Sequence, residues 1–196
     1  MQKLDLNGIA VSNIPAYSTD GVAQLVFALI LEHTNSVAIH SNSVHSGEWA
    51  ASKDFCYWNK PLFELDGKTL GIIGFGKIGK AVAKIAASFG MKILANTNHP
   101  APFENVDFTS VDDLLSKSDF ISIHCPLTPA TEGMVNAEFL SKMKKTAVLI
   151  NTSRGQVVNE KALAALKDGK ITVEDGKQHY ACELISALWQ QKVERL

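Results

Sequence analysis

The chain has 196 residues, of which 46% are hydrophobic and 20% are charged, and its formal net charge is −1. This is the composition of an ordinary globular protein, and it excludes a disordered chain. Because no cluster of lysines and arginines stands out, the sequence also argues against a nucleic-acid-binding surface.

The cysteine pattern excludes a disulfide framework. Cys56, Cys125 and Cys182 are far apart and form no CxxC pair. An odd number of cysteines at such spacing predicts reduced thiols and argues against a zinc site. The sequence has no signal-peptide pattern, and its longest apolar stretch, residues 22–31, is too short to cross a bilayer. We therefore expect a cytoplasmic protein that binds neither a membrane nor a metal ion.

The first part of the chain predicts a short strand followed by a long helix. Residues 8–13 are apolar enough for a strand, and Pro15 ends it. Because a strand at this position would be uncovered, we expect residues 1–19 to be the remnant of a preceding domain. Apolar positions then recur at helical spacing, which predicts a connecting helix over residues 20–47.

An aromatic segment follows this helix. Its aromatic residues are Trp49, Phe55, Tyr57, Trp58 and Phe63. Aromatic side chains in a connecting loop either form an interface or anchor the loop on the core, and anchoring is the default expectation. The histidines of the preceding helix, His33, His40 and His45, lack the spacing of a zinc-binding helix, so solvated or packing roles are expected.

From residue 68 on, predicted strands alternate with predicted helices. The strands are residues 69–73, 92–95, 120–123 and 147–150, and the helices are residues 77–89, 111–116, 136–143 and 159–168. Continuous apolar strands that alternate with helices predict an α/β fold: a Rossmann-type doubly wound parallel sheet with helices on both faces. We expect an incomplete NAD(P)-binding domain over residues 48–171. Residues 172–196 break the rhythm and form a divergent tail, with a predicted helix over 180–194.

A glycine-rich turn joins the first of these strands to its helix. It follows the pattern GxGxxG, in which the first glycine allows a tight turn, the second lets the backbone approach a pyrophosphate, and the third lets helix and strand pack closely. The start of the helix presents free N–H groups to the phosphates. The residues expected at a dinucleotide are Gly74, Phe75, Gly76, Lys77, Ile78 and Gly79.

The second strand lacks the acidic residue that commonly follows it in NAD-binding domains. There the chain reads Asn96, Thr97, Asn98 and His99. Without a carboxylate nothing repels a 2′-phosphate, and no arginine is present there to bind one. NAD(H) is therefore the expected cofactor, and NADP(H) is the alternative.

Two further segments follow strands and are expected at the same edge of the sheet. One begins with His124 and Cys125, and the other contains Arg154. In open α/β sheets, ligands bind at the carboxyl ends of the strands. An arginine in this place can hold a carboxylate through two parallel hydrogen bonds, and the alternative is a surface arginine in a turn.

Taken together, these segments resemble the D-isomer-specific 2-hydroxyacid dehydrogenases, and among them the glycerate and hydroxypyruvate reductases most. The resemblance covers about residues 6–171. The segments that carry it are residues 13–15, 22–23, 47–49, 65–79, 124–127 and 151–155.

The resemblance implies roles for individual residues. Arg154 would be catalytic, because it would bind the substrate carboxylate and polarise the 2-oxo group while hydride passes between nicotinamide and substrate. Family members pair through the long helix and the loop beside it, which implies a homodimer. The residues implied at the cofactor, besides the glycine-rich turn, are Thr97, His124, Cys125, Pro126, Thr131, Asn151, Thr152, Ser153 and Arg154.

Other parts of the family's machinery are not found in the sequence. The substrate domain would precede residue 1, and the glutamate and histidine that should follow Arg154 cannot be placed, since His179 comes too soon. We therefore expect a chain truncated at both ends and inactive as written. Two hypotheses follow: an oxidoreductase that acts on small 2-oxo and 2-hydroxy acids, or a catalytically inactive fragment that binds a nucleotide or dimerises.

Overall fold

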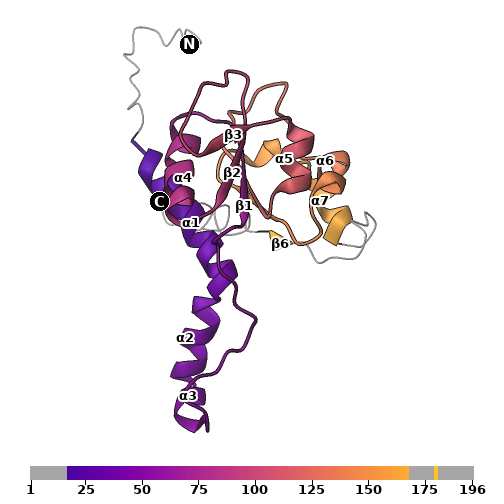
Figure 1. Ribbon diagram of the computed structural model, residues 1–196. Helices are drawn as coiled ribbons and strands as arrows, with labels where there is room; N and C mark the ends of the chain where they lie inside the picture. Colours follow the sequence, from indigo (N-terminus) through magenta and orange to yellow (C-terminus); the bar gives the residue numbers. More distant parts are fainter. Residues whose placement is uncertain (1–16, 168–178, 181–196) are drawn as a thin grey trace, which may run out of the picture.

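A parallel sheet of six strands forms the centre of the protein (Figure 1). The computed structural model describes residues 17–167 and 179–180. The strands are β1 (Thr69–Ile73), β2 (Lys92–Asn96), β3 (Val106–Phe108), β4 (Phe120–Ile123), β5 (Val148–Asn151) and β6 (His179–Tyr180). Their order across the sheet is β3-β2-β1-β4-β5-β6, and every neighbouring pair is parallel.

Helices cover both faces of the sheet, so the predicted doubly wound fold is confirmed. α1 (Thr19–Asn35) and α4 (Lys77–Ser88) pack on one face, where Val26, Ile30 and Val82 meet alternate residues of the strands. The helices α5 (Val111–Lys117), α6 (Ala137–Lys142) and α7 (Glu160–Lys167) contribute to a second core cluster on the other face. The strand predicted over 8–13 and the helix predicted over 180–194 lie outside the described residues.

The helix ends follow from local chemistry. Ser110 and Asn136 precede α5 and α6, and their side chains accept the N–H groups of Asp113 and Phe139. Such caps satisfy donors that the first turn of a helix cannot pair internally. Gly90 follows α4 and ends it, as predicted, with a φ of +69° that favours glycine. A side chain at Gly90 would also collide with Asp66.

The structure corrects the single helix predicted over residues 20–47. α1 ends at Asn35, and Ser36 adopts a left-handed conformation with φ of 48° before α2 (Val37–His45) begins at an angle of 59°. α3 (Glu48–Ala51) follows. Among the described residues, no single helix is long and apolar enough to cross a membrane, although α1 and α2 reach the required length and composition as a bent pair.

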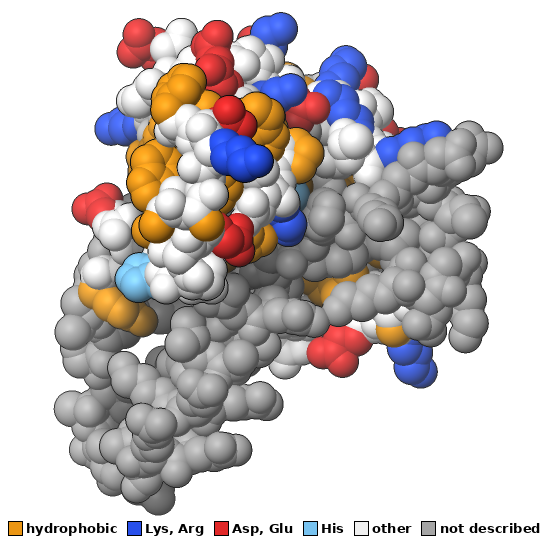
Figure 2. All heavy atoms as spheres, turned by 90° about the horizontal axis from the view of Figure 1, so that it is seen from below, with side chains coloured by type: hydrophobic (Ala, Val, Ile, Leu, Met, Phe, Trp, Pro, Cys, Tyr) orange, Lys and Arg blue, Asp and Glu red, His pale blue; other side chains and the backbone are white. Residues whose placement is uncertain are grey.

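α2, α3 and the chain that returns to Phe63 extend away from the sheet (Figure 1), and we call residues 37–62 the arm. A hydrogen bond of 2.7 Å between Ser43 and Tyr57 holds the two sides of the arm together. Phe55 is 90% exposed and Trp58 65% exposed, so the expectation that the aromatic residues anchor a loop on the core is wrong for these two. It is confirmed for Phe63, whose ring stacks on core residue Phe120 at 6.5 Å. Seen from the end to which the arm extends, hydrophobic side chains gather among charged ones (Figure 2).

Asp119 ties three strands together at the amino end of the sheet. Its carboxylate accepts the Thr69 N–H at 2.8 Å and pairs with the Lys144 ammonium group at 2.9 Å. Burial by itself raises the pKa of this carboxyl group, but the Thr69 N–H and the Lys144 charge together outweigh burial and lower the pKa below its usual value. The charged form of Asp119 therefore stabilises the fold.

We predict that Asp119→Asn lowers the free energy of unfolding at pH 7 by about 1–3 kcal/mol, because it removes a hydrogen-bonded charge. The pKa of Asp119 is lower in the folded state than in the unfolded state. Its contribution is therefore complete above pH of about 4 and is lost as the pH falls through the folded-state pKa.

Urea unfolding of both proteins between pH 7 and pH 3 measures this difference, which should shrink below pH of about 4. Asp107→Asn is the matched control, because Asp107 is exposed on β3. A difference between wild type and Asp119→Asn that stays constant over the whole range would contradict the assignment.

Candidate functional site

The glycine-rich turn after β1 packs directly against the end of β4. Gly74 has a φ of +93°, and a Cβ atom placed on it would lie 2.6 Å from the Cys125 nitrogen. A Cβ on Gly79 would lie 2.5 Å from the Gly74 oxygen, so any side chain there would push α4 off the turn. Both glycines are therefore required by packing.

Gly76 differs from these two glycines. It is exposed, its φ is −82°, and nothing lies within 4 Å of a Cβ placed on it. It is the N-cap of α4, and no side chain caps the helix there. The first turn, which includes Lys77 and Ile78, therefore has no side-chain cap among the described residues, and uncapped N–H groups at a helix start bind phosphate well. The turn thus offers the open cradle that a pyrophosphate needs.

This turn lies where the sheet changes winding direction. From β1 the chain runs outward to β2 and β3, and then returns to β4 on the other side of β1. In sheets of this order, the crevice between the two central strands at their carboxyl ends is the usual place of a dinucleotide. The structure therefore places the predicted turn and the predicted segment after β4 side by side.

The side chain of Phe75, predicted at the cofactor, is buried in the core. Its ring is 7% exposed and meets the rings of Phe103 and Phe108 edge to face, each at 5.2 Å. Only the main chain of Phe75 is left for a ligand.

The end of β2, residues 96–99, carries neither an acidic side chain nor an arginine that would select between the two cofactors. Thr97 is half-buried, and its hydroxyl group accepts the His99 N–H at 3.4 Å. The Asn96 side chain is already used, since it donates to the Thr109 carbonyl at 2.9 Å. Thr97, Asn98 and His99 are thus the polar side chains that this strand end presents.

The side chains after β4 are uncharged. His124 lies 2.8 Å from the hydroxyl group of fully buried Ser122, and burial lowers the pKa of His124 to about 4. Burial likewise raises the pKa of the Cys125 thiol. His124 is therefore neutral and Cys125 protonated near neutral pH. Ser122 was not predicted, and its position two residues before His124 on the same strand face is the signal that could have found it.

Thr131 closes the loop that follows β4. Its hydroxyl group donates to the Pro126 carbonyl at 2.6 Å and accepts the Thr128 N–H at 2.8 Å. These bonds fix the shape of the loop on which the exposed Pro126 lies. The structure thus gives Thr131 a structural role within the loop.

The segment after β5 presents the one arginine of the described residues. Arg154 is exposed, and its guanidinium group donates to the Ser153 carbonyl at 2.9 Å. No carboxylate of the described residues pairs with it. The hydroxyl oxygen of Thr152 is buried without a hydrogen-bond partner in the described part of the chain. β5 lies two strands from β1, which is about 10 Å at ordinary strand spacing.

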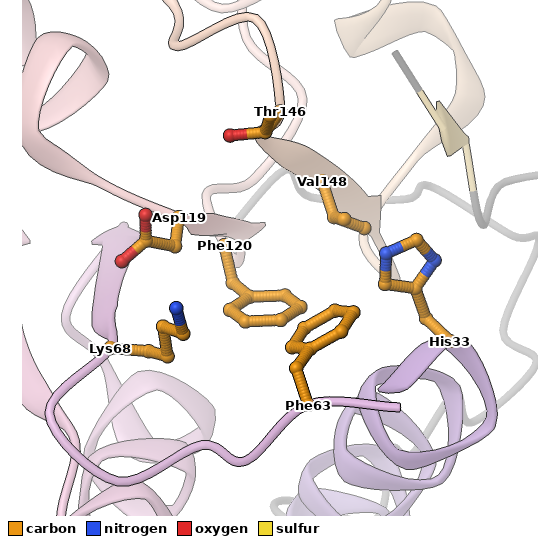
Figure 3. Close-up of a pocket in the computed structure, with 7 residues that line it drawn as sticks. All are labelled: His33, Phe63, Lys68, Asp119, Phe120, Thr146 and Val148. Atoms are coloured by element: carbon orange, nitrogen blue, oxygen red, sulfur yellow. The ribbon is translucent and has the colours of Figure 1, made fainter. Parts of the chain in front are cut away.

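A cavity of about 250 Å³ lies at the amino ends of the strands, opposite the carboxyl ends where the predicted site residues are found (Figure 3). Phe63, Phe120 and Val148 form its apolar wall, and Lys68 and Asp119 lie on its other side. Because these residues begin or precede the strands, the cavity is far from every predicted site residue. Within residues 17–167 and 179–180, no group of three or more acidic, histidine or cysteine side chains is arranged to hold a metal ion.

Comparison with known families gives one match that spans most of the chain. Residues 27–175 match the family described as D-isomer specific 2-hydroxyacid dehydrogenase, NAD binding domain. The chain is 48% identical over 168 residues to a hydroxypyruvate reductase of Blautia hydrogenotrophica, with 84% of this chain and 52% of that protein covered. It is 44% identical to a glycerate dehydrogenase of Methylorubrum extorquens, with 84% and 51% covered.

Solved structures agree with these relatives. The fold is similar to that of a D-lactate dehydrogenase from Aquifex aeolicus complexed with NAD and lactic acid. The TM-score is 0.72 at 35% sequence identity, and 95% of this chain and 56% of that chain are covered. The chain therefore spans about half the length of the curated relatives it matches.

The three glycines should respond differently to alanine. We predict that Gly76→Ala weakens NADH binding at least about tenfold, because a methyl group would occupy the space of a phosphate, while the free energy of unfolding changes by about 1 kcal/mol or less. Gly74→Ala should lower the free energy of unfolding by about 3 kcal/mol or more. Gly74 has a positive φ, and the added methyl group would collide with the main chain at the end of β4.

Fluorescence titration with NADH and urea unfolding measure the two effects. Gly21→Ala is the control, since a Cβ at Gly21 also meets nothing within 4 Å but lies in α1. Unchanged NADH affinity in Gly76→Ala would remove the turn from the cofactor site.

Proposed function

The chain belongs to the D-isomer-specific 2-hydroxyacid dehydrogenase family, and from that premise we propose that residues 74–79 hold the pyrophosphate of NAD(H) in an oxidoreductase that acts on small 2-oxo and 2-hydroxy acids. The observation that carries the proposal is the open space over Gly76, at an uncapped helix start beside the end of β4. Gly74 and Gly79 fit the same purpose, since both are required by packing that leaves the main chain bare.

Each strand end contributes one part of the proposed cofactor site. Thr97, after β2, lies where a ribose hydroxyl group is expected, and His124, Cys125 and Pro126, after β4, flank the adenosine. Because His124 is neutral, it adds no charge to this side of the site. Thr131 supports the site indirectly, through its hydrogen bond to Pro126.

The nicotinamide end of the site is assigned to the segment after β5. The cofactor supplies the hydride chemistry when it is bound. The buried hydroxyl group of Thr152, which has no partner in the described part of the chain, fits a place beside a polar ligand group. Arg154 carries a charge that no described carboxylate neutralises, and it binds the substrate carboxylate and polarises the 2-oxo group.

We also propose a division of the chain. Residues 48–171 form the NAD(P)-binding domain, residues 20–47 connect it to the substrate side, and residues 1–19 belong to that side. Residues 172–196 form a divergent tail. Since the chain spans about half the length of its relatives, the substrate-binding half of the activity is assigned to the family's other domain.

A second candidate function is nucleotide binding without turnover. It is favoured by the sequence after Arg154, in which His179 is the one histidine present. The resemblance implies a glutamate and histidine pair that moves the proton, and such general acid–base catalysis contributes about 10²–10⁴-fold.

Titration with NADH and NADPH, run beside an assay of NADH oxidation with hydroxypyruvate and glyoxylate, separates the two candidates. We expect NADH to bind, and NADH binding without turnover would select the second candidate. Measurable turnover would select the oxidoreductase, and turnover that survives Arg154→Ala would contradict the role of Arg154. If neither nucleotide binds, both candidates are rejected.

The arm is the proposed surface for a second copy of the chain. Trp49, Phe55 and Trp58 expose 54%, 90% and 65% of their surface on an element that extends away from the sheet. Exposed apolar surface of this kind marks an interaction site. A homodimer also agrees with the pairing that the family resemblance implies.

We predict that Trp58→Glu raises the dissociation constant of the dimer at least about tenfold, because it places a charge in an apolar interface. Sedimentation equilibrium measures the change. Tyr17→Glu is the control, since Tyr17 is 83% exposed but precedes α1. A wild-type chain that is monomeric at all concentrations, or a Trp58→Glu dimer of unchanged affinity, would refute the arm as the dimer contact.

A further inference from the structure

Asn151, the last residue of β5, is 7% exposed and directs its whole side chain to the turn that carries Arg154. Its Oδ1 atom accepts the Ser153 N–H at 3.0 Å and the Ser153 hydroxyl group at 2.8 Å. Its Nδ2 atom donates to the Arg154 carbonyl at 2.9 Å. Because an N–H group can only donate and a carbonyl oxygen can only accept, a single orientation of the amide satisfies both partners.

The backbone on the other side of Arg154 is fixed independently. A short 3₁₀ helix, Gly155–Val157, follows at once, and Val158 then bridges to Val135. Gly133 donates its N–H to the Gln156 carbonyl at 2.8 Å. Arg154 therefore lies between two anchors, and the upstream anchor consists of one side chain.

We propose that Asn151 is a positioning residue for Arg154, and not a ligand of the cofactor. The inference rests on the proposed function, in which Arg154 binds the substrate carboxylate. The Asn151 amide contacts the turn and lies below the surface, so it acts by holding the Arg154 main chain where it leaves the sheet. A guanidinium group binds a carboxylate in bidentate fashion only when its position is closely defined.

NMR of the arginine Nε–Hε groups tests this directly, without any ligand. The chain has two arginines, Arg154 and Arg195, so the spectrum holds two signals, and the signal that Arg154→Ala removes identifies Arg154. In Asn151→Asp the residue keeps its size but loses the donor to the Arg154 carbonyl. We expect the heteronuclear NOE of Arg154 to fall, which reports a more mobile side chain, while the Arg195 signal stays unchanged.

Two further variants keep the result decisive. Ser153→Ala removes one of the three bonds and should lower the Arg154 NOE less than Asn151→Asp does; it also decides the matter if Asn151→Asp fails to fold. Asn96→Asp is the matched control, because Asn96 ends β2 with the same kind of bond, to Thr109. If the Arg154 NOE is unchanged in folded Asn151→Asp, or in Ser153→Ala when Asn151→Asp does not fold, the proposal is overturned.

A binding experiment separates this proposal from the proposed function. With NADH bound, Asn151→Asp should weaken the binding of oxamate, a 2-oxo acid analogue, at least about tenfold while it changes NADH affinity less than about threefold. If NADH affinity falls as far as oxamate affinity, Asn151 is a cofactor ligand and the proposal is wrong. If wild type binds no oxamate, the other half of the substrate site, which is assigned to the family's other domain, is required for binding, and the NMR result alone decides the role of Asn151.

Discussion

The contact between Gly74 and the main chain at the end of β4 is the constraint on which the rest of the site depends. No atom can be added at Gly74 without moving His124 or Cys125, so the turn and the neighbouring strand end form one backbone surface. Because β1 and β4 are also the strands between which the sheet changes direction, this surface lies at the crevice of the fold. The open side at Gly76 is a consequence: the other two glycines bring the backbone in, and Gly76 leaves it uncovered.

Much of this arrangement could be predicted from the sequence because the signals are local. The buried strands are continuous apolar runs, and β1 and β4 have the predicted bounds. β3 was not predicted, since its three residues are half-buried or exposed and gain strand structure only by pairing with β2 at the edge of the sheet. The break at Ser36 was also missed, because serine gives no signal for a left-handed conformation.

The site shows the same limit. The glycine-rich turn of the site could be predicted from the spacing of its glycines. The hydrogen-bond partners of the polar side chains could not be predicted, because they depend on tertiary contacts. Phe75 stands inside the glycine pattern and yet its ring belongs to the core, since Phe103 and Phe108 meet it there. Ser122 is read as one more strand residue until the fold places its hydroxyl group beside His124. Motif reasoning thus finds where a ligand lies sooner than it finds what each side chain does.

The cavity of Figure 3 indicates that the two ends of the strands tolerate mutation differently. The cavity lies at the amino ends of the strands, whereas every proposed ligand contact lies at their carboxyl ends. Larger apolar side chains at Thr146 or Val148 would fill empty volume without reaching the proposed nucleotide site, and filling a void is a common route to a more heat-resistant protein. Substitutions at the amino ends of the strands can therefore raise the stability of the domain independently of the proposed cofactor site.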